Sequence, residues 1–133
     1  MTKENIHINS IVMNKEQSLF KAFYHAWKGI QQFFLYDRNG RIHLGAAIAA
    51  VMMGFILPVS NVEWIVLLVC IAAVIALEMI NAAIEKLCDM VHEAYHPMIR
   101  IIKDISAGAV LWVSMVSAVI AAIIFIPKIM ELL

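Results

Sequence analysis

Trp64-Ile-Val-Leu-Leu-Val-Cys-Ile-Ala-Ala-Val-Ile-Ala-Leu77, followed by Glu78-Met-Ile-Asn81-Ala-Ala-Ile-Glu85-Lys-Leu-Cys-Asp89, is the stretch that decides the fold. Its first half is uncharged and mostly branched apolar, and its second half carries three acids and one amide. At 100° per residue, positions 78, 81, 85 and 89 fall within about 80° of one another on a helix. The stretch therefore predicts a membrane-spanning helix with a polar stripe near one end.

This polar stripe has two interpretations. Ionisable groups at membrane depth are costly, so they indicate a functional site. Alternatively, the helix simply leaves the membrane there and exposes a solvated face. The second interpretation explains Glu85 and Asp89 well, but it explains Glu78 less well, because Glu78 has apolar sequence on both sides. We therefore favour a functional site.

The composition indicates an integral membrane protein. The chain has 133 residues, enough for one domain, of which 63% are hydrophobic. Such a content is far above that of a soluble globular protein. Ten basic residues balance ten acidic ones, so the charge indicates no nucleic-acid partner. We expect a polar tail over residues 1–17 and a single membrane-embedded domain over residues 18–133.

An amphipathic pattern precedes the spans. Aromatic and aliphatic side chains recur at helical spacing between Leu19 and Phe34, opposed by Lys21, Lys28 and two glutamines. Such a helix suits the membrane surface, although its apolar face could equally pack on other helices. Asp37–Arg41 breaks the pattern, and its Asn-Gly pair predicts a turn.

Three apolar segments predict three spans in an all-α integral membrane fold. A short connection, Pro58–Glu63, separates the first two, and a loop is expected over His92–Ile102, because Pro97 disfavours helix at the residue before it. Pro127 and Lys128 are expected to end the third. The predicted spans are Ile42–Leu57, Val62–Val91 and Ile105–Ile126.

The placement of lysine and arginine predicts the topology. Most precede the first span, Lys86, Arg100 and Lys103 flank the predicted second loop, and none lies in the first connection. The N-terminus and the second loop should therefore face the cytoplasm, and the C-terminus the outside. This topology brings Asp37, the acidic stripe and Lys103-Asp104 to one interface.

Small residues spaced by four recur in the first and third spans. In lipid such rows let helices approach closely. Because three spans form a thin bundle with little interior, we expect the chain to form homo-oligomers. The rows are Ala46, Ala50 and Gly54, then Ser114, Ala118 and Ala122.

Carboxylates and a lysine at one interface suit Mg²⁺ and a polyphosphate. Mg²⁺ is commonly held by one or two carboxylates together with substrate phosphates. The sequence has no Gly-rich phosphate loop of the soluble type, which excludes a soluble-type nucleotide fold but not a membrane-embedded one. The alternative is a non-enzymatic channel or regulatory membrane protein. A channel needs polar residues deep within the spans, where the third span offers only small hydroxyls such as Ser106, Ser114 and Ser117.

Three motifs resemble the prokaryotic diacylglycerol kinase family. They are Glu78-x-x-Asn81-x-Ala-Ile-Glu85-x-x-x-Asp89, Glu93-x-Tyr-His-Pro97 and Lys103-Asp104-x-x-Ala-Gly-Ala-Val110. The resemblance, which covers about residues 18–128, implies a homotrimeric, three-span lipid kinase of the bacterial cytoplasmic membrane. It implies MgATP as phosphate donor and diacylglycerol or undecaprenol as lipid acceptor. Arg41-Ile-His43-Leu is more similar to the Gram-positive branch, whose members often phosphorylate undecaprenol.

The resemblance also implies roles for individual residues. Glu78 matches the family's catalytic base, and Glu85 matches a metal-binding glutamate. Asn81 matches a residue that orients the active site, while Lys103 and Asp104 match groups that contact the nucleotide.

Asp37 and Ala82 depart from the family pattern. Asp37 falls where the family's first-segment metal ligand is usually a glutamate, so its carboxylate is about one methylene further back. Ala82 replaces the usual Thr or Ser and removes a hydroxyl contact.

Overall fold

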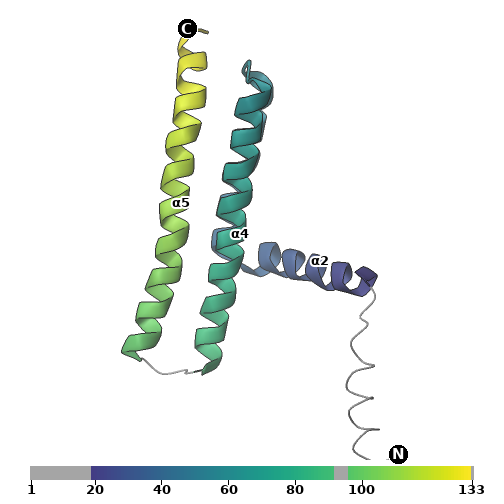
Figure 1. The fold of residues 1–133 in the computed structure, drawn as a ribbon, viewed down its shortest axis with the longest axis vertical. Coiled ribbons are helices and arrows are strands. Elements are labelled where there is room, and N and C mark those ends of the chain that lie inside the picture. The colour runs from purple at the N-terminus through teal and green to yellow at the C-terminus, as the bar shows by residue number, and fades with distance from the viewer. Residues whose placement is uncertain (1–18, 92–95, 133) are drawn as a thin grey trace, which may run out of the picture.

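The computed structural model describes residues 19–91 and 96–132, which form four helices. They are α2 (Leu19–Tyr36), α3 (Arg38–Ile56), α4 (Asn61–Val91) and α5 (Pro97–Met130). The long helices α4 and α5 run side by side, and α2 projects sideways from the bundle (Figure 1). The polar tail predicted over residues 1–17 lies outside the described residues.

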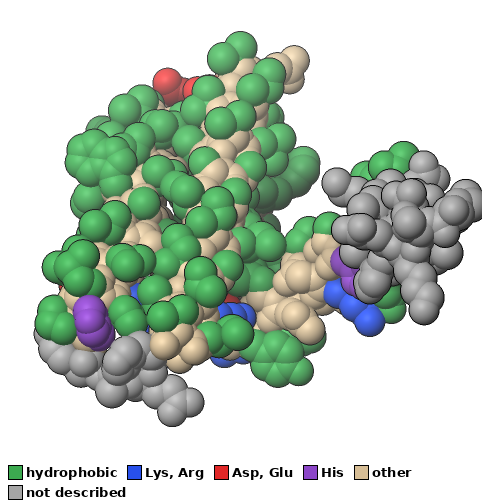
Figure 2. Space-filling model, turned by 60° about the horizontal axis from the view of Figure 1, so that its bottom comes forward, with side chains coloured by type: hydrophobic (Ala, Val, Ile, Leu, Met, Phe, Trp, Pro, Cys, Tyr) green, Lys and Arg blue, Asp and Glu red, His purple; other side chains and the backbone are tan. Residues whose placement is uncertain are grey.

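Helices α3, α4 and α5 are each long and apolar enough to cross a membrane, which confirms the three predicted spans. Hydrophobic side chains cover most of the visible surface of the bundle (Figure 2). In a bilayer such side chains need no burial, because lipid tails are as apolar as they are. The helix predicted after Leu19 is present as α2, and its location at the membrane surface stays a prediction.

A single extended residue, Asp37, forms the corner between α2 and α3. Its Oδ1 accepts a 2.7 Å hydrogen bond from the Gly40 amide and caps α3. The buried Phe33 ring packs against Gly40, where an added Cβ would lie 2.5 Å from Phe33 Cζ. The predicted Asn39-Gly40 turn is therefore wrong. Both residues belong to the first turn of α3, because the cap at Asp37 already begins the helix.

Polar contacts join α4 and α5 at the end of the bundle where α4 begins. Ser60 and Glu63 form a capping box at the start of α4, in which Glu63 Oε2 accepts a 2.7 Å hydrogen bond from the Ser60 amide. The other oxygen, Oε1, lies 2.9 Å from Lys128 Nζ of α5. Next to these contacts, a small core packs α4 against α5 and the end of α3. Its buried members are Leu57, Leu67, Ile124 and Phe125.

Two predicted ends of α5 are wrong. The helix begins at Pro97, so 97–102 is helical and not a loop, while 92–95 lie outside the described residues. Proline is favoured in a first helical turn, and His96 Nδ1 caps the helix by accepting a 3.3 Å hydrogen bond from the Met98 amide. The helix also continues through Pro127 to Met130, which places Lys128 beside Glu63.

Candidate active site

Asn81 joins the acidic face of α4 to α5. Its Nδ2 donates a 3.1 Å hydrogen bond to Glu85 Oε1, one helical turn later. Its Oδ1 accepts a 2.7 Å hydrogen bond from Ser106 Oγ of α5. The side chain is buried, with 4% of its surface exposed, so these bonds replace its contacts with water. They fix both the orientation of the amide and the position of the Glu85 carboxylate.

Glu78 is buried on the same face of α4, with 3% of its surface exposed. It interacts electrostatically with His43, Asp37 and Glu85. Together with Asn81 and Glu85 it lines a cavity of about 240 Å³, which we call the polar cavity. The other walls come from α3 and α5, through Asn39, Ile42, His43, Ala107, Val110, Leu111 and Ser114.

The structure brings together three of the predicted site residues, Glu78, Asn81 and Glu85. Asp37 interacts electrostatically with Glu78 but does not line the polar cavity. One of its oxygens already caps α3, which leaves the other for any further contact. Asp37 is therefore adjacent to the site, and one of its two carboxylate oxygens is used to cap α3.

Lys103 and Asp104 do not line the polar cavity. Lys103 Nζ is 2.9 Å from Asp89 Oδ1, and it also interacts electrostatically with Glu85. Asp104 is exposed and lies 3.8 Å from the Arg100 guanidinium. A flexible lysine near Glu85 has the reach to contact a phosphate at the open side of the cavity. Asp104 is not brought to the cavity by these contacts.

The donor atoms around the cavity suit a hard cation. Glu78 and Glu85 offer carboxylate oxygens and Asn81 an amide, and Mg²⁺ prefers oxygen ligands. Within residues 19–91 and 96–132, no group of three or more His, Cys, Asp or Glu side chains is arranged to hold a metal alone. This set fits Mg²⁺ that is bound together with a polyphosphate, since phosphates commonly complete its coordination.

Four further polar residues belong to the site and are not predicted from the sequence. Asn39 and His43 line the polar cavity from α3, Ser106 bonds to Asn81, and Ser114 lines the cavity from α5. Their spacing carries a signal, because residues four apart share a helix face and isolated polar residues in apolar helices are unusual. That signal does not indicate which neighbouring helix each face meets.

Comparisons with known proteins agree with this architecture. The family model described as prokaryotic diacylglycerol kinase matches residues 24–125. An undecaprenol kinase of Bacillus subtilis is 36% identical over 86% of this chain and 94% of its own length. A diacylglycerol kinase of Synechocystis is 30% identical over 87% of this chain and 67% of its own length. The diacylglycerol kinase of Escherichia coli K12 is 28% identical over 77% of this chain and 83% of its own length. The chain therefore belongs to the prokaryotic diacylglycerol kinase family.

Proposed function

We propose that this chain is a lipid kinase that transfers the γ-phosphate of MgATP to the hydroxyl of a membrane lipid alcohol at the cytoplasmic interface. The observation that carries the proposal is the buried Glu78 carboxylate, which lies in a cavity with the Asn81–Glu85 pair. Burial of a carboxylate between apolar helices is costly even with the hydrogen bond that Asn39 donates to it, so the retention of Glu78 there favours a catalytic role.

Glu78 is the proposed general base. It removes the proton from the lipid hydroxyl as the oxygen attacks the γ-phosphorus. A new oxygen–phosphorus bond forms, the bond between the γ-phosphorus and the bridging oxygen breaks, and ADP leaves. Glu78 precedes Glu85 by two helical turns, about 10.5 Å along α4. This separation favours a base on the lipid side and the phosphates on the water side.

Glu85 and Asp37 are the proposed magnesium ligands, and Asn81 orients Glu85 through their 3.1 Å hydrogen bond. Mg²⁺ neutralises phosphate charge when it is bound. Lys103 is proposed to contact the nucleotide phosphates, for which it must exchange its contact with the exposed Asp89. Such an exposed ion pair is worth little, so the exchange is easy. Asp104, at the same end of α5, is proposed to contact the nucleotide from the aqueous side.

Undecaprenol is the lipid acceptor that we favour, and diacylglycerol is the alternative. The Bacillus subtilis relative is named an undecaprenol kinase. Its match to this chain covers more of its own length, at higher identity, than the matches of the two relatives named diacylglycerol kinase. Both alcohols present one hydroxyl to Glu78. A side-by-side assay of the two lipids decides between them.

A homotrimer in the bacterial cytoplasmic membrane is the proposed assembly. Support comes from the exposed apolar side chains of all three spans and from the small-residue rows. The proposed topology places the N-terminus in the cytoplasm and the C-terminus outside.

The test uses the full chain, purified and reconstituted in bicelles. ADP release that depends on both Mg²⁺ and an added lipid alcohol supports the kinase. Ion flux across proteoliposomes without ADP release supports the channel alternative instead. Phosphorylated lipid, identified by mass spectrometry, shows that phosphate has reached the lipid rather than water.

A further inference from the structure

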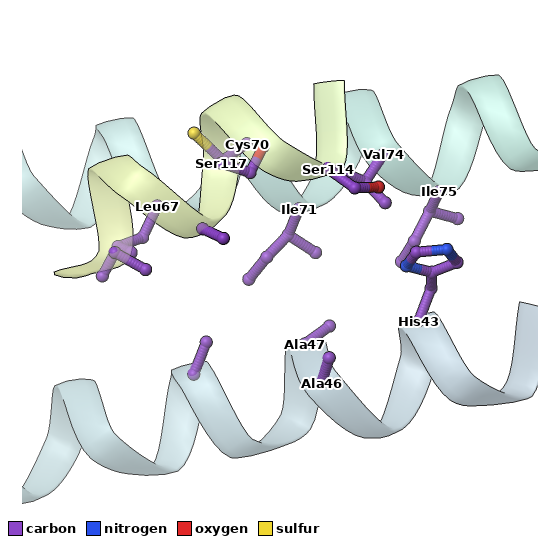
Figure 3. Close-up of a pocket in the computed structure, with 13 residues that line it drawn as sticks. His43, Ala46, Ala47, Leu67, Cys70, Ile71, Val74, Ile75, Ser114 and Ser117 are labelled. Atoms are coloured by element: carbon purple, nitrogen blue, oxygen red, sulfur yellow. The ribbon is translucent and has the colours of Figure 1, made fainter. Parts of the chain in front are cut away.

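A second cavity, of about 190 Å³, lies between α3, α4 and α5 (Figure 3). We call it the apolar cavity, because alanine, isoleucine, valine and leucine side chains form most of its wall. Along α4 its lining residues run from Ile75 to Leu67, away from Glu78 and towards the start of α4. Eight residues of helix correspond to about 12 Å. The cavity is partly open, and its mostly apolar wall suits a hydrocarbon chain, because the transfer of apolar surface out of water is favourable.

The two cavities share part of their walls. His43 of α3 and Ser114 of α5 line both the polar and the apolar cavity. In Figure 3 the Ser114 oxygen points along the cavity towards the end where His43 lies. The apolar cavity therefore begins where the polar cavity, with Glu78, ends.

Ser114 Oγ is a buried atom for which the described part of the chain supplies no hydrogen-bond partner. Buried hydroxyls are nearly always paired, so an unpaired one beside a cavity indicates a ligand or a water molecule. A serine hydroxyl donates one hydrogen bond. Glu78, across the polar cavity, accepts one when it is ionised. An alcohol is the chemical group that matches this pair, since its oxygen accepts and its hydrogen donates.

We propose that the apolar cavity binds the hydrocarbon segment next to the reacting hydroxyl of the acceptor lipid. Ser114 donates a hydrogen bond to the hydroxyl oxygen, while Glu78 accepts its hydrogen. Ser114 is thus a substrate-positioning residue. The inference rests on the proposed kinase function. It adds the location of the acceptor lipid, whose first 12 Å or so of hydrocarbon chain lie between the three spans of one protomer.

Filling the cavity provides the first test. Ala47 lines the apolar cavity, whereas Ala49 of the same helix lines neither cavity. With farnesol as a short, single-chain alcohol, A47L is expected to raise the KM for farnesol at least tenfold and leave the KM for MgATP unchanged. A49L is expected to stay within twofold of the wild type. Equal effects of the two variants on the KM for farnesol would overturn the proposed binding site.

Removing the hydroxyl provides the second test. Ser114, which lines both cavities, is replaced by alanine, and by threonine as the matched control. S114A is expected to lower kcat/KM for farnesol about 3- to 10-fold, the effect of one hydrogen bond. S114T, which restores a hydroxyl, is expected to recover most of this loss. A wild-type kcat/KM for farnesol in S114A would exclude the assigned hydrogen bond.

A binding readout separates this inference from the kinase function itself. A farnesol analogue with a diazirine on its second prenyl unit is photolysed with wild-type protein in the absence of nucleotide. Labelling of α4 at Ile71, blocked by excess farnesol, is the expected result, because this side chain lies in the apolar cavity. Labelling confined to the outward-facing Leu68 would overturn the inference. Labelling at Ile71 in a protein that releases no ADP with any lipid alcohol would support the site and overturn the kinase function.

Discussion

Ser106 Oγ of α5 donates a 2.7 Å hydrogen bond to Asn81 Oδ1 of α4, and Asn81 in turn holds Glu85. Two spans are thereby joined through one amide at the proposed active site. The same serine hydroxyl lies 2.9 Å from the Lys103 carbonyl oxygen of its own helix, so its single hydrogen is shared or alternates between two acceptors.

The first prediction concerns this hydrogen bond. S106A should free the Asn81 amide to rotate and leave Glu85 without a fixed partner. We expect kcat to fall about 3- to 10-fold and the Mg²⁺ concentration for half-maximal activity to rise, since one hydrogen bond is lost. S106T keeps a hydroxyl and should retain activity. Lipid-dependent ADP release, measured as a function of Mg²⁺, checks both variants. Unchanged Mg²⁺ dependence in S106A would show that the bond does not position Glu85.

The second prediction separates two roles of Asp37. Its Oδ1 caps α3, and its charge is proposed to bind metal. D37S keeps a capping oxygen but removes the charge, whereas D37A removes both. D37A should therefore lose about 0.5–2 kcal/mol of stability, and D37S should stay close to the wild type.

Activity distinguishes the metal role of Asp37. If its charge binds metal, D37S should lose activity at limiting Mg²⁺, and D37E, which restores the family's usual residue, should retain or exceed wild-type activity. Thermal unfolding in detergent and ADP release measure the two roles separately. A fully active D37S would leave Asp37 with the capping role alone.

The third prediction concerns Glu85. E85Q keeps the size of the side chain and can still pair with the Asn81 amide through its carbonyl oxygen, but it has no charge. It should weaken Mg²⁺-dependent nucleotide binding while the protein stays folded. Calorimetric titration with MgATP gives the affinity, and E131Q, at the opposite end of the bundle, is the control for loss of one charge. Wild-type activity of E85Q at limiting Mg²⁺ would show that Glu85 is not the ligand.

The sequence alone predicts the three spans and the common face of Glu78, Asn81 and Glu85, because both depend on periodicity along one helix. The ends of α5 were misplaced for a physical reason. The length of an apolar run reflects the thickness of the membrane that it must cross. The ends of a helix are set instead by the residues that cap its terminal backbone groups. At Pro97 the argument against helix applies to the preceding residue, and the proline itself lies in the first turn.

Contacts between helices were less predictable. His43, Ser106 and Ser114 are visible as isolated polar residues, but the side chains they face depend on how α3 and α5 are rotated against α4. Nothing in the periodicity of one helix specifies that rotation. The pairing of Lys103 with Asp89 is of the same kind, since it joins residues on two different helices.

The fourth prediction concerns topology. The C-terminus of the chain and the connection between α3 and α4 lie at the same end of the bundle (Figure 1). The distribution of lysine and arginine predicts that this end faces outside. An alkaline phosphatase fused after Leu133 should therefore be active in cells, and one fused after Arg100 should be inactive. The opposite pattern would invert the topology and remove the proposed site from cytoplasmic ATP.

The last prediction concerns the base. Glu78 is buried in the wall of the polar cavity, about 10.5 Å before Glu85 along α4, on the side of the apolar cavity. In the proposed mechanism, a lipid hydroxyl that arrives from the bilayer meets Glu78 first, whereas the nucleotide approaches from the aqueous side, near Glu85 and Lys103. E78Q keeps the shape of the side chain and removes its ability to accept a proton. It should lower the rate of lipid phosphorylation by a factor of about 10² to 10⁴ and leave MgATP affinity nearly unchanged.

E78D keeps a carboxylate one methylene further back and should retain part of the activity. Single-turnover phosphorylation and equilibrium nucleotide binding, measured on the same samples, separate the two effects. Turnover of E78Q within a few-fold of the wild type would assign the base elsewhere, and an equal loss of nucleotide affinity would make Glu78 a binding residue.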